Sequence, residues 1–186
     1  MSNEMLRGII TDTYLGVIDI NGYKYNTHKM RVNTLDDITM LMPIFDDVEV
    51  GDCFETTDWV LTCLAPCERP MEVVVRVDKF TRCLSEGFVA SDYVNSRVTG
   101  MLCSSSKCML KEIGVDRTPF YNATLKVRNP FKESFDMYVL AFAKQAKLLS
   151  TIPSGTVIEV VVSAKRRRKE KGWEFPIAEL KVKSEV

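Results

Sequence analysis

A short pattern occurs twice in the chain: an apolar residue, a polar residue, a glycine and then two apolar residues. It stands in residues 5–10, near the start, and again in residues 97–102, past the middle. Glycine inside a β-strand often marks a bulge, or a tight bend such as the corner of a small barrel. Each copy therefore predicts the first strand of a small β-barrel, and the chain is predicted to contain two units of one plan.

The first half carries signals for strands, one tight hairpin and one short helix. Asn21-Gly22 separates two strand-like runs, and Asn-Gly in that position is a strong signal for a two-residue hairpin turn. Thr34 with Asp37 in the following turn resembles a capped helix start, and Pro43 limits that helix to a short one. Strands are predicted over residues 5–10, 15–20, 23–32, 53–64 and 71–80.

The second half repeats this order. Residues 143–149 contain good helix formers, and Pro153 and Gly155 end that helix. Strands are predicted over residues 97–102, 120–127, 135–142, 156–164 and 173–182. Three strands, a short helix and two further strands is the order of the OB-fold, a small five-stranded barrel.

The predicted fold class is therefore all-β, with two tandem OB-fold barrels that each carry a short helix between strands three and four. The predicted boundaries are an N-terminal barrel over residues 1–85, a linker over residues 86–96 and a C-terminal barrel over residues 97–186. Two units of this size fit the length of 186 residues. One larger mixed barrel is the alternative, and it would still be all-β.

The two halves have opposite charge, although the whole chain is neutral. Residues 1–95 hold 8 Lys and Arg against 16 Asp and Glu, a net charge of −8. Residues 96–186 hold 17 against 9, a net charge of +8, and include a basic run over residues 165–171 that leads to Trp173. A basic surface with a ring beside it suits a polyanion whose bases are unpaired, because cations bind the phosphates and the ring stacks on a base.

Signals for catalysis, for cofactors and for membranes are weak. His28 is the single histidine, we interpret it as a surface residue, and no nucleophile motif or glycine-rich phosphate loop accompanies it. No apolar stretch approaches the length of a membrane span, and the N-terminus does not resemble a signal peptide. We expect a non-enzymatic cytoplasmic protein with no cofactor, no metal and no membrane partner.

Two sets of residues leave a metal site open as a less favoured alternative. Six cysteines are present, but not at the spacing of a zinc site, so we expect reduced thiols in strands and no disulfide. The alternative is a metal bound by Cys63, Cys67 and Cys83. The paired carboxylates at residues 36–37 and 46–47 could likewise hold a divalent cation, but we interpret them as the flanks of the first helix.

Four segments after residue 121 match a known pattern in the right order. They are Ala123-Thr124-Leu125-Lys126-Val127, residues 138–146, residues 153–160 and the basic run before Trp173. In this order they resemble the bacterial single-stranded DNA-binding protein family and its primosomal relatives. The resemblance covers about a third of the chain well and residues 97–183 loosely.

The resemblance implies a C-terminal barrel that binds single-stranded DNA without sequence choice. Phe131 matches a position where the family carries a stacking ring, and Phe135 and Trp173 are further candidate rings. Phe120 and Phe142 are expected in the core, and Phe175 is open between core and contact. The candidate binding residues are Lys126, Arg128, Phe131, Lys132, Phe135, Lys165, Arg166, Arg167, Arg168, Lys169 and Trp173.

This sequence also departs from the family pattern. Ala143 stands where the family has a glycine before the lysine, and the acidic phenylalanine-ended tail is missing. These differences suggest a phage, plasmid or mobile-element version that acts in DNA replication or recombination. Barrels of the family act in sets of four, which implies a homodimer of this tandem chain. The alternatives are RNA binding, or an adaptor whose acidic barrel docks a replication or recombination enzyme.

Overall fold

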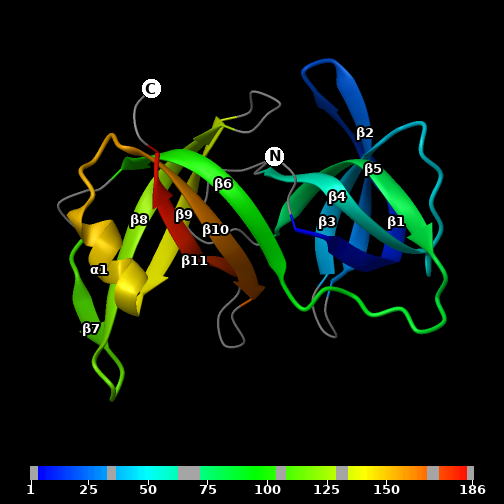
Figure 1. Ribbon diagram of the computed structural model, residues 1–186. Helices are drawn as coiled ribbons and strands as arrows, with labels where there is room; N and C mark the ends of the chain where they lie inside the picture. The colour runs from blue at the N-terminus through cyan, green and yellow to red at the C-terminus, as the bar shows by residue number, and fades with distance from the viewer. Residues whose placement is uncertain are drawn as a thin grey trace. The chain divides into compact units, whose positions relative to one another are not determined.

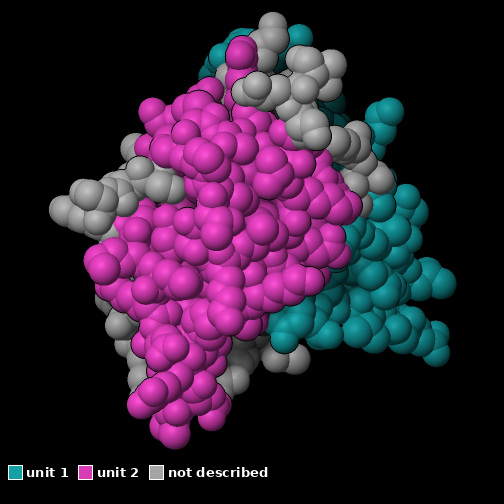
Figure 2. Space-filling view, turned by 60° about the vertical axis from the view of Figure 1, so that its left-hand side comes forward, with its two compact units in different colours: residues 1–64, 72–94 teal, residues 65–71, 95–186 magenta. Residues whose placement is uncertain are grey.

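The computed structural model describes residues 4–32, 37–62, 72–103, 108–128, 134–166 and 172–183. The chain divides into two compact units (Figure 2). Unit 1 comprises residues 1–64 and 72–94, and unit 2 comprises residues 65–71 and 95–186. The described residues form eleven strands and one short helix, so the chain is nearly all-β (Figure 1).

Unit 1 is a closed barrel of five strands. They are β1 (Leu6–Ile20), β2 (Tyr23–Arg31), β3 (Asp37–Pro43), β4 (Cys53–Thr62) and β5 (Val74–Cys83). The order around the barrel is β1-β2-β3-β5-β4, in which β3 and β5 are parallel and the other pairs are antiparallel. Fully buried side chains such as Leu6, Met30, Ile38 and Phe54 fill this unit.

The predicted hairpin turn between β1 and β2 is confirmed. Asn21 has a φ of 54° and Gly22 a φ of 84°, and a type I′ turn requires positive φ at both positions. The Gly22 N–H donates a hydrogen bond to Asp19 Oδ1 at 2.9 Å. Ile20 then pairs directly with Tyr23, so the turn fixes the register of the two strands.

The two strands predicted over residues 5–10 and 15–20 are one strand in the structure. The pairing of β1 with β2 shifts register between Ile10 and Asp12 and again between Asp12 and Gly16. Tyr14 lies in this irregular segment with a φ of 54°, and its N–H donates to His28 Nδ1 at 3.3 Å. Bulges break the alternation of apolar and polar residues, so the strand pattern of the sequence is interrupted between residues 10 and 15.

The helix predicted from Thr34 toward Pro43 is wrong. Residues 37–43 form β3, which pairs with β2 from Asp37 to Pro43 and with β5 from Thr39 to Leu41. Residues 44–52, between β3 and β4, contain turns and no helix. Five consecutive residues of β3, from Ile38 to Met42, are buried between two partner strands. This burial stabilises the strand more than the helix-start signal at residues 34–37 favours a helix. Thr34 and Asp36 lie outside the described residues.

Unit 2 has the same strand order with a helix and a short extra strand. Its elements are β6 (Val94–Cys103), β7 (Lys111–Ile113), β8 (Thr118–Arg128), β9 (Ser134–Phe142), α1 (Ala143–Thr151), β10 (Val157–Arg166) and β11 (Trp173–Val182). The sheet runs β6-β10-β11-β9-β8-β7, and a further pairing of β6 with β8 joins the two sides. β11 and β9 are parallel, as β5 and β3 are in unit 1. β7 extends β8 as a hairpin that sequence reasoning missed.

The predicted helix of the second half is confirmed as α1. It contacts β8, β9 and β11, and it buries Ala146 and Leu149 (Figure 1). The helix ends before Ile152, and Gly155 then turns the chain into β10 with a φ of 92°. In the described parts of the chain, no helix is both long enough and apolar enough to cross a membrane.

The glycine of each repeated pattern lies where the next strand approaches closely. A Cβ on Gly8 would overlap Met30 Sδ of β2, and a Cβ on Gly100 would lie 2.9 Å from the Lys126 carbonyl oxygen of β8. No register shift occurs at Gly8 in its pairing with β4 or at Gly100 in its pairing with β8. Neither glycine therefore marks a bulge in these pairings, and both lie where β1 approaches β2 and β6 approaches β8 closely.

Candidate functional site

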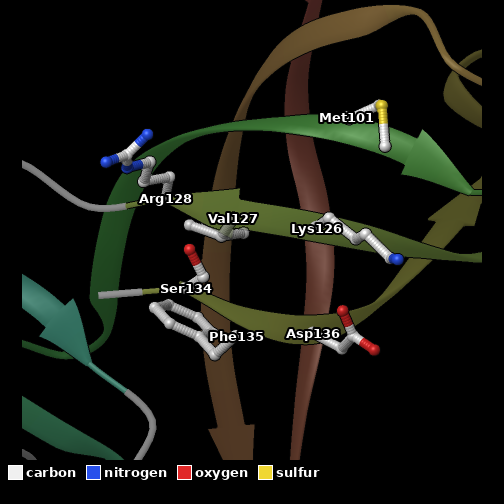
Figure 3. A pocket seen from close by; sticks show the side chains of 7 residues that line it. All are labelled: Met101, Lys126, Val127, Arg128, Ser134, Phe135 and Asp136. Atoms are coloured by element: carbon white, nitrogen blue, oxygen red, sulfur yellow. The ribbon is translucent and has the colours of Figure 1, made fainter. Parts of the chain in front are cut away.

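An open groove of about 520 Å³ lies on unit 2, at the ends of β8 and β9 nearest the connection between them. Its lining brings together three of the candidate residues, Lys126, Arg128 and Phe135 (Figure 3). The other residues that line it are Met101, Val127, Ser134 and Asp136. The groove therefore combines two cations and a ring within one hollow.

Strand register explains why these side chains meet. Lys126 of β8 pairs with Met101 of β6 on one side and with Asp136 of β9 on the other. Directly opposed residues in antiparallel strands point to the same face. The three side chains are all exposed, so they form one row across the outer face of the sheet (Figure 3). Asp136 places a carboxylate in this row and lowers the positive charge of the groove locally.

Arg128 and Phe135 complete the groove from two different faces. Arg128 is exposed and pairs with the exposed Ser134, so it continues the outer row that begins with Lys126. Phe135 pairs with Val127, which is buried, so the ring leans toward the interior side and is half-buried. The predicted alternation of exposed Lys126 and Arg128 with buried Val127 is confirmed.

A ring pair with one exposed member lies on the same outer face, at the opposite end of β8 and β9. Phe120 and Phe142 are register partners with ring centroids 5.3 Å apart, and Phe142 is 37% exposed. The expectation that both rings belong to the core is wrong for Phe142, and Phe120 is half-buried. Tyr138, also half-buried, lies between the ring pair and Lys126.

We call this surface the β8–β9 face. It comprises the outward residues of the two strands, from the ring pair to the groove: Phe120, Asn122, Thr124, Lys126, Arg128, Ser134, Asp136, Tyr138, Leu140 and Phe142. Lys126 lies six residue steps along β8 from Phe120, a span of about 20 Å. Rings lie at one end of this face and cations at the other.

The position of Phe142 could have been found from the sequence. Side chains alternate between the two faces of a strand, so residues of equal parity share a face. Phe120 therefore shares a face with Lys126, and Phe142 shares one with Asp136. Treating Phe120 and Phe142 as core residues because they are apolar overlooked this period of two.

Trp173 does not fit the role predicted for it. It is 3% exposed, and Phe175 and Ile177, which follow at intervals of two, are also buried. The three side chains lie on the inner face of β11, because they alternate along the strand with the less buried Glu174 and Pro176. Trp173 therefore offers no exposed ring for a base, and Phe175 belongs to the core.

Much of the predicted basic surface lies outside the described residues. This holds for Phe131 and Lys132, and for Arg167, Arg168 and Lys169. Arg166 ends β10, but its side chain is also outside the described part. Lys165 is exposed on β10, where it pairs with Glu174 of β11, and it does not line the groove.

Two further cations of unit 2 bind a carboxylate. Glu159, on β10, is mostly buried, and its carboxylate accepts from Arg97 Nη1 at 2.8 Å and from Lys183 Nζ at 3.1 Å. The hydrogen bond from Arg97, and then the one from Lys183, lowers the pKa of Glu159. The Glu159 carboxylate therefore links β10 to β6 through Arg97 and to the end of β11 through Lys183.

His28 is buried in unit 1, so its interpretation as a surface residue is wrong. Its side chain is fully buried, and the Tyr14 ring meets it edge-on at 5.1 Å. Burial lowers the pKa of His28. Within the described ranges, no group of three or more Cys, His, Asp or Glu could hold a metal ion. Cys63 and Cys67, of the alternative metal site, and Asp36 lie outside those ranges.

No protein-family model matches the sequence, and no curated protein matches it either. The structure matches the wild-type single-stranded DNA binding protein from Thermus aquaticus with a TM-score of 0.65 at 14% identity, covering 100% of this chain and 94% of that chain. The chain has the fold of a bacterial single-stranded DNA-binding protein.

Two further structures are similar. A deletion mutant of the same Thermus aquaticus protein matches with a TM-score of 0.64 at 14% identity, covering 100% of this chain and 96% of the mutant. The protein priB from Ralstonia solanacearum matches with a TM-score of 0.40 at 21% identity, covering 48% of this chain and 97% of that protein. The Thermus aquaticus matches confirm, at the level of the fold, the resemblance found in residues 122–182.

Proposed function

We propose that this protein is a non-enzymatic, largely sequence-independent single-stranded DNA-binding protein built from two tandem OB-fold barrels, with unit 2 carrying most of the affinity. The observation that carries the proposal is the β8–β9 face, which places exposed cations and a ring pair with one exposed member, Phe142, on one surface of a chain with this fold. Cations bind phosphates of any sequence, and every base has a face on which a ring can stack.

The proposed path of the DNA runs along the β8–β9 face. Lys126 and Arg128 bind phosphates at the groove, Phe135 borders them, and Phe142 with Phe120 stacks on bases about 20 Å further along. Phosphate contacts hold the strand without reading its sequence, and stacking requires bases that are unpaired. A duplex keeps its bases stacked inside, so it cannot use the rings.

The basic run over residues 165–169 and the pair Phe131 and Lys132 extend this path as proposed contacts. The replacement of Arg166, Arg167 and Arg168 by alanine is expected to weaken binding about equally across sequences and to reduce the salt dependence. By the family resemblance, the chain is proposed to act as a homodimer in DNA replication or recombination. A phage or mobile-element origin is part of this proposal.

One observation favours a second function for unit 1, as an adaptor that docks a basic partner such as a replication or recombination enzyme. Phe45 is 91% exposed and is followed by Asp46 and Asp47 in the connection between β3 and β4. An exposed ring beside carboxylates suits a partner with cations and an apolar side chain, and it disfavours a polyanion.

Fluorescence anisotropy of labelled oligonucleotides tests the main proposal. Both tryptophans are buried, Trp59 at 4% and Trp173 at 3% exposure, so a label on the DNA is the better reporter. Labelled oligo-dT, oligo-U and duplex DNA are titrated at two salt concentrations. The proposal predicts tightest binding to oligo-dT, weak duplex binding and clear weakening with salt. Preference for oligo-U would indicate an RNA-binding protein. If none of the three binds, the adaptor function of unit 1 would be the remaining proposal.

Two groups of variants then locate the site. Lys126→Gln with Arg128→Gln removes two phosphate contacts, so the slope of log affinity against log salt should become shallower by roughly 0.7 for each contact. Lys147→Gln is the matched control, because Lys147 is exposed on α1 and does not line the groove. An equal loss in the control would contradict this placement of the phosphate contacts.

Phe142→Ala removes a stacking surface without changing charge. It should weaken oligo-dT binding by about 1–3 kcal/mol and leave the salt slope unchanged. Phe142→Leu keeps most of the apolar volume but has no aromatic face, so it should lose nearly as much affinity as the alanine variant. Wild-type affinity in Phe142→Leu would show that the ring packs and does not stack on a base.

A further inference from the structure

We propose that Cys53 and Cys83 form a reversible dithiol–disulfide pair that can lock β4 to β5 in unit 1. The two residues are direct register partners in the antiparallel β4–β5 ladder. Cys53 is also the register partner of Ile9 on β1, so the pair lies beside the seam where β1 meets β4. The inference concerns unit 1 and is independent of DNA binding by unit 2.

The geometry of an antiparallel pair suits a disulfide. Directly opposed residues have Cα atoms about 4.5–5.5 Å apart and side chains on the same face of the sheet. A disulfide needs Cα atoms roughly 4.4–6.8 Å apart. Both cysteines are free thiols in the structure, with Cys53 buried and Cys83 half-buried. Their backbones can therefore be joined without any change of strand register.

The hydrogen bonds of the two thiols are weak, so a disulfide between them can replace these bonds. Cys53 Sγ lies 3.7 Å from the Gly51 carbonyl oxygen, and Cys83 Sγ lies 3.7 Å from the Thr81 carbonyl oxygen. These are weak hydrogen bonds of each thiol to the backbone carbonyl two residues before it. Burial, and then the charge of the neighbouring Cys83, raises the pKa of Cys53.

The oxidant is a low-molecular-weight disulfide such as oxidised glutathione. The more accessible Cys83 thiolate attacks one sulfur of that molecule, which forms a mixed disulfide and releases one small thiol. The Cys53 thiolate then attacks the Cys83 sulfur and releases the second small thiol. Two protein thiols are oxidised, one small disulfide is reduced to two small thiols, and the protons of Cys53 and Cys83 pass to the released thiolates.

Closing the bond constrains the chain between residues 53 and 83, which includes the whole of β4 and β5. A disulfide stabilises mainly by restricting the unfolded chain. Oxidation should therefore raise the unfolding temperature of unit 1, on the order of 5 °C or more, and leave that of unit 2 unchanged. Trp59, in unit 1, and Trp173, in unit 2, report the two transitions separately when each is kept alone by a Trp→Phe change.

The test uses the full chain in which Cys63, Cys67, Cys103 and Cys108 are changed to serine. Buffers of increasing oxidised-to-reduced glutathione ratio are followed by thiol counting and by mass spectrometry of proteolytic peptides. The proposal predicts that both thiols are lost together in a monomer, that one peptide pair links Cys53 to Cys83, and that dithiothreitol restores both thiols. The unfolding temperature of unit 1 should rise and fall with the link.

Cys83→Ser in this background is the matched control, because Cys83 is half-buried and tolerates a hydroxyl at the surface. Its remaining thiol should stay free, and its unfolding temperature should not respond to the glutathione ratio. Three results would overturn the proposal. Both thiols could stay reduced, Cys83 could remain a mixed disulfide with glutathione, or the disulfide could form between two protein molecules. In the wild-type chain, a link from Cys83 to Cys63 or Cys67 in place of Cys53 would overturn it too.

Discussion

Ala143 begins α1 in a conformation that favours glycine. Its φ is 50°, in the left-handed region, which costs a residue with a Cβ roughly 1–2 kcal/mol. Glycine adopts this region without the steric cost, and glycine is the residue that the family pattern has at this position. The substitution seen in the sequence therefore has a physical consequence that the sequence alone did not reveal.

Ala143→Gly should stabilise unit 2 by about 0.5–1 kcal/mol, because relief of the left-handed strain exceeds the added entropy of the unfolded chain. Urea unfolding followed by Trp173 fluorescence in a Trp59→Phe background measures this change. Ala146→Gly is the control: Ala146 is buried within the same helix, and glycine there should destabilise unit 2. Loss of stability in both variants would show that Ala143 is not strained.

His28 makes the stability of unit 1 depend on pH. Nδ1 accepts the Tyr14 N–H, and Nε2 is buried with no hydrogen-bond partner among the described residues, so the neutral ring fits and a charged ring does not. Burial lowers the pKa of His28 from the ordinary 6.5, so the unfolded chain binds the proton first as pH falls. The stability of unit 1 is therefore undiminished above pH 6.5 and decreases below it.

The expected slope below pH 6.5 is up to about 1.4 kcal/mol per pH unit, the value for one proton. Urea unfolding of a Trp173→Phe chain, followed through Trp59, gives the free energy of unfolding at each pH. His28→Gln removes the titrating group, and its stability should change less between pH 7 and pH 5. Identical pH profiles for the two chains would contradict the account of His28.

At the scale of elements, the two repeated glycines should respond differently to a methyl group. A Cβ on Gly8 would lie against Met30 Sδ and Cγ, which are side-chain atoms, whereas a Cβ on Gly100 would lie against the backbone of Lys126. Gly8→Ala and Gly100→Ala should each destabilise their own unit by about 1–3 kcal/mol. Only the first clash can be relieved by shortening a neighbouring side chain.

A double-mutant cycle separates the two cases. Gly8→Ala combined with Met30→Ala should cost less than the sum of the single changes, with a coupling of about 1 kcal/mol or more. Gly100→Ala combined with Leu125→Ala should be close to additive, since the Lys126 carbonyl remains. Chemical unfolding of the single and double variants measures both cycles, and additive costs for Gly8 and Met30 would contradict the close approach of β1 and β2.

The elements also show where sequence reasoning works. The hairpin at Asn21-Gly22 and the helix α1 were predictable because their signals are local: positive φ in a turn, and helix formers that end at Pro153 and Gly155. β3 was not predictable from its neighbourhood, since its five buried residues depend on β2 and β5, which come from elsewhere in the chain. Tertiary pairing decided that segment.

At the scale of the whole molecule, the fold was more accessible than the site. Two errors in unit 1, one strand read as two and one strand read as a helix, left the predicted number of strands at five. The site depended on which face each ring occupies. Lys126 and Arg128 were placed correctly by alternation, but Trp173 was not, because its neighbour in the sequence is the basic run and its neighbours in space are core residues.

The most direct measurement for the central claim is photo-crosslinking of the full chain to oligo-dT that carries 5-bromodeoxyuridine, followed by mapping of the modified residues. Binding along the β8–β9 face predicts crosslinks on peptides that contain Phe120, Tyr138 or Phe142, and their loss with excess unlabelled oligo-dT. Crosslinks confined to unit 1, or unit 2 crosslinks that unlabelled oligo-dT does not compete away, would contradict it.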